Sequence, residues 1–233
     1  MDRSKICVSL AGVDAATVHN EVQPVLAKVD VVEIRLDSMT APEVAKCCAM
    51  LRKPLLFTNR PVWEGGGFAG FEEDRLSPLY AAVELQADYV DFELRADPLL
   101  RRQLLEAMES ASTRMILSWH DFKSTPTAEE LGGVLEQMMD SGAHIGKIVT
   151  TAHGAADVLR VLQLQGRALA ADFPLSCFCM GDSGRISRLA TLYLGGYMTY
   201  GAVSDAQATA PGQLSVDRLY ALCREFEKGS ADG

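Results

Sequence analysis

A lysine interrupts an apolar run in the second half of the chain. The run at residues 145–150, IGKIVT, is typical of a buried strand, where a permanent charge is costly. Burial favours the neutral amine of a lysine, and a neutral amine is a nucleophile that forms an imine with a ketone. Lys147 is therefore the candidate nucleophile, and the structural alternative is a snorkelling or edge lysine.

Further ionisable residues occur on the strands predicted upstream. Because side chains alternate along a strand, Glu33 and Arg35 share one face of their strand, and Asp91 and Glu93 share one face of theirs. The ionisable residues predicted toward the carboxyl ends of five successive strands are Glu33, Arg35, Arg60, Asp91, Glu93, His120 and Lys147. A structural lattice of ion pairs is the alternative, but this concentration of charge favours an active site.

A histidine follows at the end of the strand that precedes Lys147. Taken alone, His120 would indicate a satisfied core histidine, but its position favours a general acid and base that works near neutral pH. We expect Glu93, on the preceding strand, to accept a hydrogen bond from the imidazole and to fix its tautomer. The alternative for Glu93 is an unrelated ion pair with Arg35 or Arg60.

Hydrophobic periodicity predicts eight strands, each followed by a helix. The predicted strands are residues 5–10, 29–36, 54–58, 88–94, 114–119, 146–150, 175–179 and 198–202. The predicted helices are residues 15–27, 42–51, 74–85, 98–110, 128–141, 155–165, 185–194 and 216–227. Capping signals stand before three helices, at Asp97-Pro98, Thr40…Glu43 and Thr127…Glu130.

Strict alternation with short connections predicts a parallel sheet with right-handed crossovers. Eight units in this length match a single (β/α)₈ TIM barrel over residues 1–233 better than the alternative, an open doubly wound sheet. No G-x-G-x-x-G follows the first strand, and the glycines at 65–67 fall in a loop after the third. Polar residues at the carboxyl ends of barrel strands point into the mouth, where barrel active sites lie.

The last two units carry anion-binding chemistry. Residues 180–188, MGDSGRISR, lead from a strand into a helix, and a helix amino terminus with an arginine suits a carboxylate or phosphate. Arg188 is the candidate, with a solvated helix residue as the alternative. The polar stretch 204–213 after the last strand is predicted to be an active-site lid, or else an ordinary surface loop.

The composition is that of a globular domain with an acidic surface. The chain has 233 residues, 48% of them hydrophobic, and a net charge of −9, and it has no basic run, which argues against nucleic-acid binding. Its six cysteines follow neither a zinc-ligand nor a disulfide pattern, and Cys177 and Cys179 are expected to be core thiols. The sequence contains no signal peptide or membrane-spanning run, so a reducing cytoplasm is the expected location.

An ordered set of motifs covers nearly the whole chain. The motifs are VEIRLD at 32–37, FTNR at 57–60, EGG at 64–66, DFEL at 91–94, SWHDF at 118–122, TP at 125–126, GKI at 146–148, MG at 180–181, SRL at 187–189 and ATAPGQ at 208–213. Together they resemble type I 3-dehydroquinate dehydratase, the imine-forming enzyme of the shikimate pathway, from about residue 6 to about residue 227.

The resemblance implies syn loss of water from 3-dehydroquinate to give 3-dehydroshikimate, with no metal or organic cofactor. Carried over by position, Lys147 forms the imine, His120 moves the proton and Glu93 orients His120. The implied substrate-binding residues are Glu33, Arg35 and Arg60 for the ring hydroxyls, Arg188 and Gln213 for the carboxylate, and Thr209, where the family more often has serine. Trp119 replaces a small polar residue of the family, and alternation predicts that it faces the helices.

Two other functions fit parts of the pattern. A class I Schiff-base aldolase on the same barrel also uses a strand lysine, but Asp182 would repel the phosphate that such substrates carry. A non-catalytic carboxylate-binding barrel would have no use for Lys147, His120 and Glu93 together. Beyond the small-molecule substrate, the candidate partners are a second copy in a homodimer and a shikimate dehydrogenase, to which some relatives are fused; no nucleic acid or membrane is expected.

Overall fold

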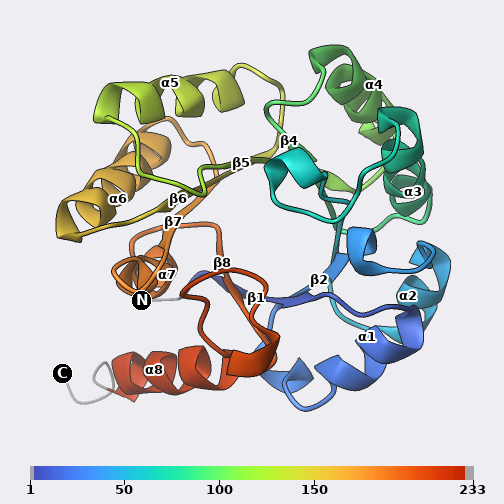
Figure 1. Ribbon diagram of the computed structural model, residues 1–233, viewed down its shortest axis with the longest axis horizontal. Helices are drawn as coiled ribbons and strands as arrows, with labels where there is room; N and C mark the ends of the chain where they lie inside the picture. Colours follow the sequence, from blue (N-terminus) through green and yellow to red (C-terminus); the bar gives the residue numbers. More distant parts are fainter. Residues whose placement is uncertain (1–2, 229–233) are drawn as a thin grey trace.

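The computed structural model describes residues 3–228, and within this range eight parallel strands form an inner ring that eight α-helices surround (Figure 1). The strands are β1 (Lys5–Leu10), β2 (Val31–Arg35), β3 (Leu55–Thr58), β4 (Tyr89–Glu93), β5 (Arg114–His120), β6 (Ile145–Thr151), β7 (Leu175–Met180) and β8 (Met198–Gly201). The helices are α1 (Ala15–Val22), α2 (Val44–Met50), α3 (Glu72–Glu84), α4 (Pro98–Met108), α5 (Ala128–Met139), α6 (Ala155–Ala170), α7 (Arg185–Tyr193) and α8 (Val216–Lys228).

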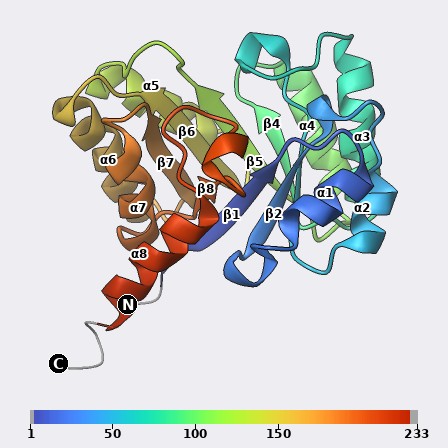
Figure 2. The same ribbon diagram turned by 60° about the horizontal axis from the view of Figure 1, so that its bottom comes forward.

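The strands pair in the order β7-β6-β5-β4-β3-β2-β1-β8, and each neighbouring pair in this order is parallel. At the remaining edge, between β7 and β8, the Tyr197 amide donates to the Leu175 carbonyl at 2.8 Å. The Met198 amide donates to the Ser176 hydroxyl beside it at 3.1 Å. The sheet is thus a nearly closed barrel, which confirms the predicted fold, and Figure 2 shows the strands running side by side within the helix layer.

The predicted element boundaries hold closely for the strands and less closely for two helices. Each strand ends within two residues of its predicted limit. Helix α1 stops at Val22 rather than at Ala27, because Pro24 has no N–H to continue the helical hydrogen bonds and its ring clashes with the preceding turn. Helix α6 continues past Gly166 to Ala170, where the periodicity had predicted an end at Gln165.

Two of the three predicted caps are present. Thr127 and Glu130 form the capping box of α5, and the Asp97 carboxylate accepts from the Leu99 amide at the start of α4. The capping box predicted at Thr40…Glu43 is wrong. The Glu43 carboxylate instead accepts from the Ala15 amide at 2.9 Å, and so satisfies an orphan donor at the start of α1.

The barrel interior changes character along its axis. Its amino-terminal half is filled by an apolar cluster that includes Cys7, Val31, Leu56, Ile145 and Met198. One pleat further along, the inward positions are polar: Glu33, Thr58, Asp91, Ser118 and Lys147, all at most 5% exposed. The strand register places Thr58 beside Asp91, and Ser118 beside Lys147. Charged groups are therefore held rigidly at the carboxyl end of the barrel.

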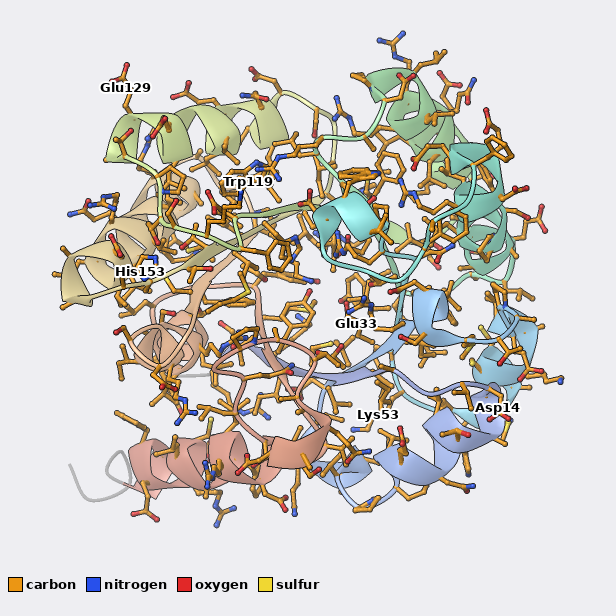
Figure 3. The ribbon with its side chains drawn as sticks, viewed as in Figure 1. Asp14, Glu33, Lys53, Trp119, Glu129 and His153 are labelled. Carbon is orange, nitrogen blue, oxygen red and sulfur yellow. The ribbon has the colours of Figure 1, made fainter. Side chains whose placement is uncertain are left out.

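The outward faces of the strands pack against the helices. Trp119 belongs to this outer core, as alternation predicted, and Figure 3 shows it between the barrel and the helix layer. Cys177 and Cys179 are buried in the same layer, and all six cysteines are free. No helix between residues 3 and 228 is both long and apolar enough to cross a bilayer.

Candidate active site

A pocket opens at the carboxyl end of the barrel. Including its open mouth it encloses about 560 Å³, a size suited to a small-molecule ligand. The predicted site residues that line it are Glu33, Arg35, Arg60, His120, Lys147, Arg188, Thr209 and Gln213. In Figure 3, Glu33 lies near the barrel centre, while Asp14, Glu129 and His153 lie at the periphery. Of the predicted site residues, Glu93 alone does not line this pocket.

Lys147 projects from the middle of β6 into the pocket and is 5% exposed. Its Nζ lies 3.4 Å from an Asp91 carboxylate oxygen and 3.8 Å from a Glu33 oxygen. The Nζ also lies 4.0 Å from the centroid of the Tyr200 ring. Both carboxylates and the ring face attract positive charge on this nitrogen, so the site suits a cationic amine or iminium as well as a nucleophile.

His120 ends β5 and points into the same pocket. Its Nδ1 lies 3.2 Å from Glu64 Oε1, and its backbone amide donates to the same oxygen at 2.8 Å. Burial lowers the pKa of the imidazole well below its usual value, and the cations Arg60, Lys147, Arg35 and Arg95 lower it further. The imidazole is therefore neutral at physiological pH, which is the form that accepts a proton.

The expectation that Glu93 orients His120 is wrong. Glu93 Oε1 accepts from Arg60 at 2.8 Å, and Glu93 Oε2 lies 2.6 Å from Arg75. Both oxygens are thus occupied by guanidinium groups behind the pocket wall. The carboxylate that holds the imidazole belongs to Glu64, which ends a short 3₁₀ helix (Val62–Glu64) in the loop after β3.

Sequence reasoning assigned no role to Glu64, although this residue belongs to the motif EGG at residues 64–66. The signal that could have found it is a carboxylate at the carboxyl end of a barrel strand, directly before glycines. Gly65 has φ +77°, and a Cβ there would lie 2.4 Å from the Phe122 ring. Since Phe122 stacks on His120 with 5.7 Å between ring centroids, the glycine lets the loop close against this pair.

Arg60 and Arg35 reach the pocket with their guanidinium groups already paired. Arg60 bonds Glu93 at 2.8 Å and Asp91 at 2.8 Å, and it also donates to Ser118. Burial alone would lower the pKa of Arg60, but the nearby carboxylates, Asp91 and Glu93 foremost and then Glu64 and Glu33, outweigh burial and raise the pKa. Arg35 makes a two-bond contact with Asp37, at 2.8 and 2.6 Å.

Arg188 differs, because it reaches the pocket from α7 without a carboxylate partner. It is 1% exposed, and its hydrogen bond to the Pro211 carbonyl is long at 3.4 Å. No acidic side chain in residues 3–228 lies within 4 Å of its nitrogens, and its Nε has no partner there. Burial lowers the pKa of Arg188 to about 10. A buried, unpaired guanidinium in a pocket is a binding site for an anion.

The loop after β8 supplies the opposite wall. The Gln213 side-chain oxygen accepts from the Thr209 amide at 2.7 Å and from the Thr209 hydroxyl at 3.1 Å. Because Oε1 is occupied in this way, the Gln213 NH₂ group is left to donate to a ligand. The Gln213 amide of this loop and the Arg188 cation of α7 thus line the same pocket.

The chemistry available is that of a lysine nucleophile with a neutral imidazole beside it and an anion site across from it. The chain matches the family model described as type I 3-dehydroquinase over residues 6–229. A 3-dehydroquinate dehydratase of Desulfotalea psychrophila is 45% identical over 226 residues, which cover 97% of this chain and 100% of that protein. The bifunctional 3-dehydroquinate dehydratase/shikimate dehydrogenase of Arabidopsis thaliana is 35% identical, over 83% of this chain and 32% of that protein.

The solved structures agree with these sequence matches. The type I 3-dehydroquinate dehydratase of Clostridium difficile, solved with covalently modified comenic acid, has a TM-score of 0.88 at 27% identity. That match covers 98% of this chain and 94% of the Clostridium chain. The 3-dehydroquinate dehydratase of Geobacillus kaustophilus has a TM-score of 0.86 at 28% identity, over 97% and 91% of the two chains. With the family model, the curated relatives and the barrel all in agreement, the chain belongs to the type I 3-dehydroquinase family.

Proposed function

We propose that this chain removes water from 3-dehydroquinate to give 3-dehydroshikimate through an imine on Lys147. The observation that carries the proposal is the position of the Lys147 Nζ, buried in a pocket that also holds a neutral imidazole and an unpaired guanidinium. The substrate offers a matching ketone, ring hydroxyls and carboxylate. Family membership supplies the reaction, and the pocket supplies a group for each of its steps.

The reaction begins when the Lys147 amine attacks the ketone carbon. The carbinolamine that forms loses water and becomes a protonated imine, which attracts electrons from the neighbouring carbon. His120 takes the proton from that carbon, and the resulting enamine expels the hydroxyl group beyond it. His120 returns the proton to this leaving oxygen, so that water departs. A water molecule then hydrolyses the imine, which releases the product and regenerates the amine.

The other pocket residues bind and orient. The Glu64 carboxylate holds His120 at Nδ1, which leaves Nε2 to accept the proton. We assign the substrate carboxylate to Arg188 and Gln213, because Arg188 is the buried pocket cation without an acidic partner among residues 3–228. Glu33, Arg35, Arg60 and Thr209 remain the proposed contacts of the ring hydroxyls and of the closing loop.

The test combines turnover with covalent trapping. Mixing the protein with 3-dehydroquinate should produce the ultraviolet absorbance of a conjugated enone, and borohydride reduction should add the ligand's mass to the peptide that contains Lys147. Lys147→Met should lose both signals. A label on Lys123, an exposed neighbour after β5, would contradict the assignment of the nucleophile. Trapping with a phosphorylated aldolase substrate but not with 3-dehydroquinate would favour the aldolase alternative.

Location and assembly are part of this proposal. A cytoplasmic enzyme fits six free cysteines and a pathway of soluble metabolites. Homodimer formation and association with a shikimate dehydrogenase stay predictions, the second prompted by bifunctional relatives such as the Arabidopsis protein. Light scattering of the purified chain, alone and with a shikimate dehydrogenase, measures both.

A further inference from the structure

Arg95 lies two residues after the end of β4 and contacts two residues of the pocket wall, Glu64 and His120. Its Nη1 lies 3.4 Å from Glu64 Oε2 and donates to the His120 carbonyl oxygen at 3.0 Å. Its guanidinium carbon lies 4.7 Å from the centroid of the Trp119 ring. One side chain thus contacts the carboxylate that holds His120, the backbone of His120 and the residue before it.

We propose that Arg95 is a positioning residue for proton transfer, which acts through Glu64 on His120. This inference rests on the proposed function, because it assigns Arg95 to the same acid–base step. Glu64 divides its two oxygens between the two residues: Oε1 receives the His120 amide and faces the imidazole, and Oε2 faces Arg95. The carboxylate is therefore clamped from both sides and cannot rotate away from the ring without losing Arg95.

The other cation near Glu64 cannot take over this task. Arg60 also lowers the pKa of Glu64, but its guanidinium nitrogens are bonded to Asp91, Glu93 and Ser118. The Glu64 carboxylate itself is buried, with 0% of its side chain exposed, so water does not replace a lost partner easily. Arg95 is the cation that is directed at Oε2.

Trp119 holds Arg95 in place. The Arg95 side chain is 44% exposed, and an exposed arginine alone is a weak and mobile partner. The indole of Trp119, packed in the outer core, gives the guanidinium a flat surface on which to stack. The tryptophan that stands before His120 thereby acquires a role, although its side chain points away from the pocket.

The charge of Arg95 lowers the pKa of Glu64 and also that of His120. Burial raises the pKa of Glu64, whereas Arg60, Arg95 and the His120 amide lower it, and Asp91 raises it. Arg95 also lowers the pKa of His120, together with Arg60, Lys147 and Arg35. Removing Arg95 should therefore raise both pKa values, so that Glu64 becomes neutral and His120 becomes protonated at a higher pH. Both changes move the acidic limb of the pH–rate profile upward.

The test compares Arg95→Gln with Arg102→Gln, which removes the same charge from an exposed position of α4. For a partly exposed pair we expect the acidic limb of kcat to shift upward by about 0.5 pH unit in Arg95→Gln, which is about a threefold loss of kcat on that limb. Arg102→Gln should follow the parent profile. Arg95→Lys should recover part of the shift, and Trp119→Leu should show a smaller shift of the same sign.

An Arg95→Gln profile that coincides with the parent profile would overturn the proposal, as would an equal shift in Arg102→Gln. A second measurement tests the role of Arg95 even if the parent protein does not act on 3-dehydroquinate. Titration of the His120 imidazole by NMR needs no turnover, and its midpoint should lie higher in Arg95→Gln than in the parent and in Arg102→Gln. Equal midpoints would overturn the clamp whatever reaction the site performs.

Discussion

Arg60 and Arg188 are both buried arginines of one pocket, yet their surroundings are opposite. Arg60 faces two carboxylates at 2.8 Å each, whereas Arg188 has a carbonyl at 3.4 Å and the face of the Phe178 ring, 4.7 Å from its guanidinium carbon. The pKa of Arg60 is raised by its partners, and burial lowers that of Arg188 to about 10. Although both arginines are buried, the charge of Arg60 is already compensated by carboxylates, whereas Arg188 has no carboxylate partner within residues 3–228.

The contrast extends to the elements around each arginine. On one side, Arg60, Arg75, Asp91 and Glu93 form a paired cluster of two cations and two anions behind β3 and β4. On the other, Arg188, Thr209 and Gln213 form an open cluster between α7 and the loop after β8. The charges of the paired cluster compensate one another without a ligand, although Arg60 also faces the pocket, Asp91 also lies near Lys147 and Arg75 also pairs with Glu72. The open cluster is a binding site, because its charge is compensated when an anion arrives.

The largest effect that tests this comparison is on folding stability. Arg60→Met should lower the free energy of unfolding by about 3–5 kcal/mol, because it leaves Asp91 and Glu93 buried with less compensation. Denaturant unfolding followed by circular dichroism measures the change. A loss below about 1 kcal/mol would mean that Arg75 and Lys147 neutralise the carboxylates by themselves, and that Arg60 is not needed to balance the cluster.

The same substitution at Arg188 should lower kcat/KM without lowering the free energy of unfolding. Arg188→Met removes the proposed anion partner, and losing a buried charged hydrogen bond costs about 2–5 kcal/mol, so kcat/KM should fall at least tenfold. Stability without ligand should stay level or rise by roughly 1 kcal/mol, since an unpaired buried charge is replaced by an apolar side chain. Arg188→Lys should recover little activity, because a lysine lacks the planar fork. Destabilisation equal to that of Arg60→Met would break the comparison.

A smaller effect is the pH dependence of the folding stability that arises from His120. The pKa of folded His120 lies well below 6.5, so the folded state binds this proton less readily than the unfolded state. The stability that this shift contributes is present above pH 6.5 and is lost as the pH falls toward the folded pKa, with a slope of at most about 1.4 kcal/mol per pH unit. Unfolding measured from pH 7.5 to 5 should show this slope in the parent and in Arg188→Met, and a flatter one in His120→Asn.

The two clusters also show which features of the site can be predicted from the sequence and which cannot. Alternation and strand order placed Glu33, Arg35, Arg60, His120 and Lys147 at one pocket, because a barrel brings the carboxyl ends of its strands together. Arg188 was predicted from the anion-binding pattern at residues 180–188, and Thr209 and Gln213 were predicted from the family resemblance. The pairing of individual carboxylate oxygens with guanidinium or imidazole nitrogens depends on the conformation of the loops, which strand patterns do not specify. Glu93 is on the correct strand, but Arg60 and Arg75 take its oxygens, and the helical turn at Val62–Glu64 carries Glu64 to His120 instead. Arg75 comes from α3, a helix whose contribution no strand pattern contains.

The smallest effect tests whether the open cluster depends on its loop. Gln213 Oε1 accepts two hydrogen bonds from Thr209, through the amide and the hydroxyl, and this pairing leaves the Gln213 NH₂ group to donate to a ligand. Thr209→Val keeps the amide bond and the side-chain shape but loses the hydroxyl bond, which is worth about 0.5–1.5 kcal/mol. KM for 3-dehydroquinate should therefore rise by about two- to tenfold while kcat changes little, because the reacting groups on β5 and β6 are untouched. Thr209→Ser keeps the hydroxyl and is the matched control, with steady-state kinetics close to the parent. A fall in kcat with an unchanged KM would place Thr209 at the chemical step, and the open cluster would then be more than a clamp for the carboxylate.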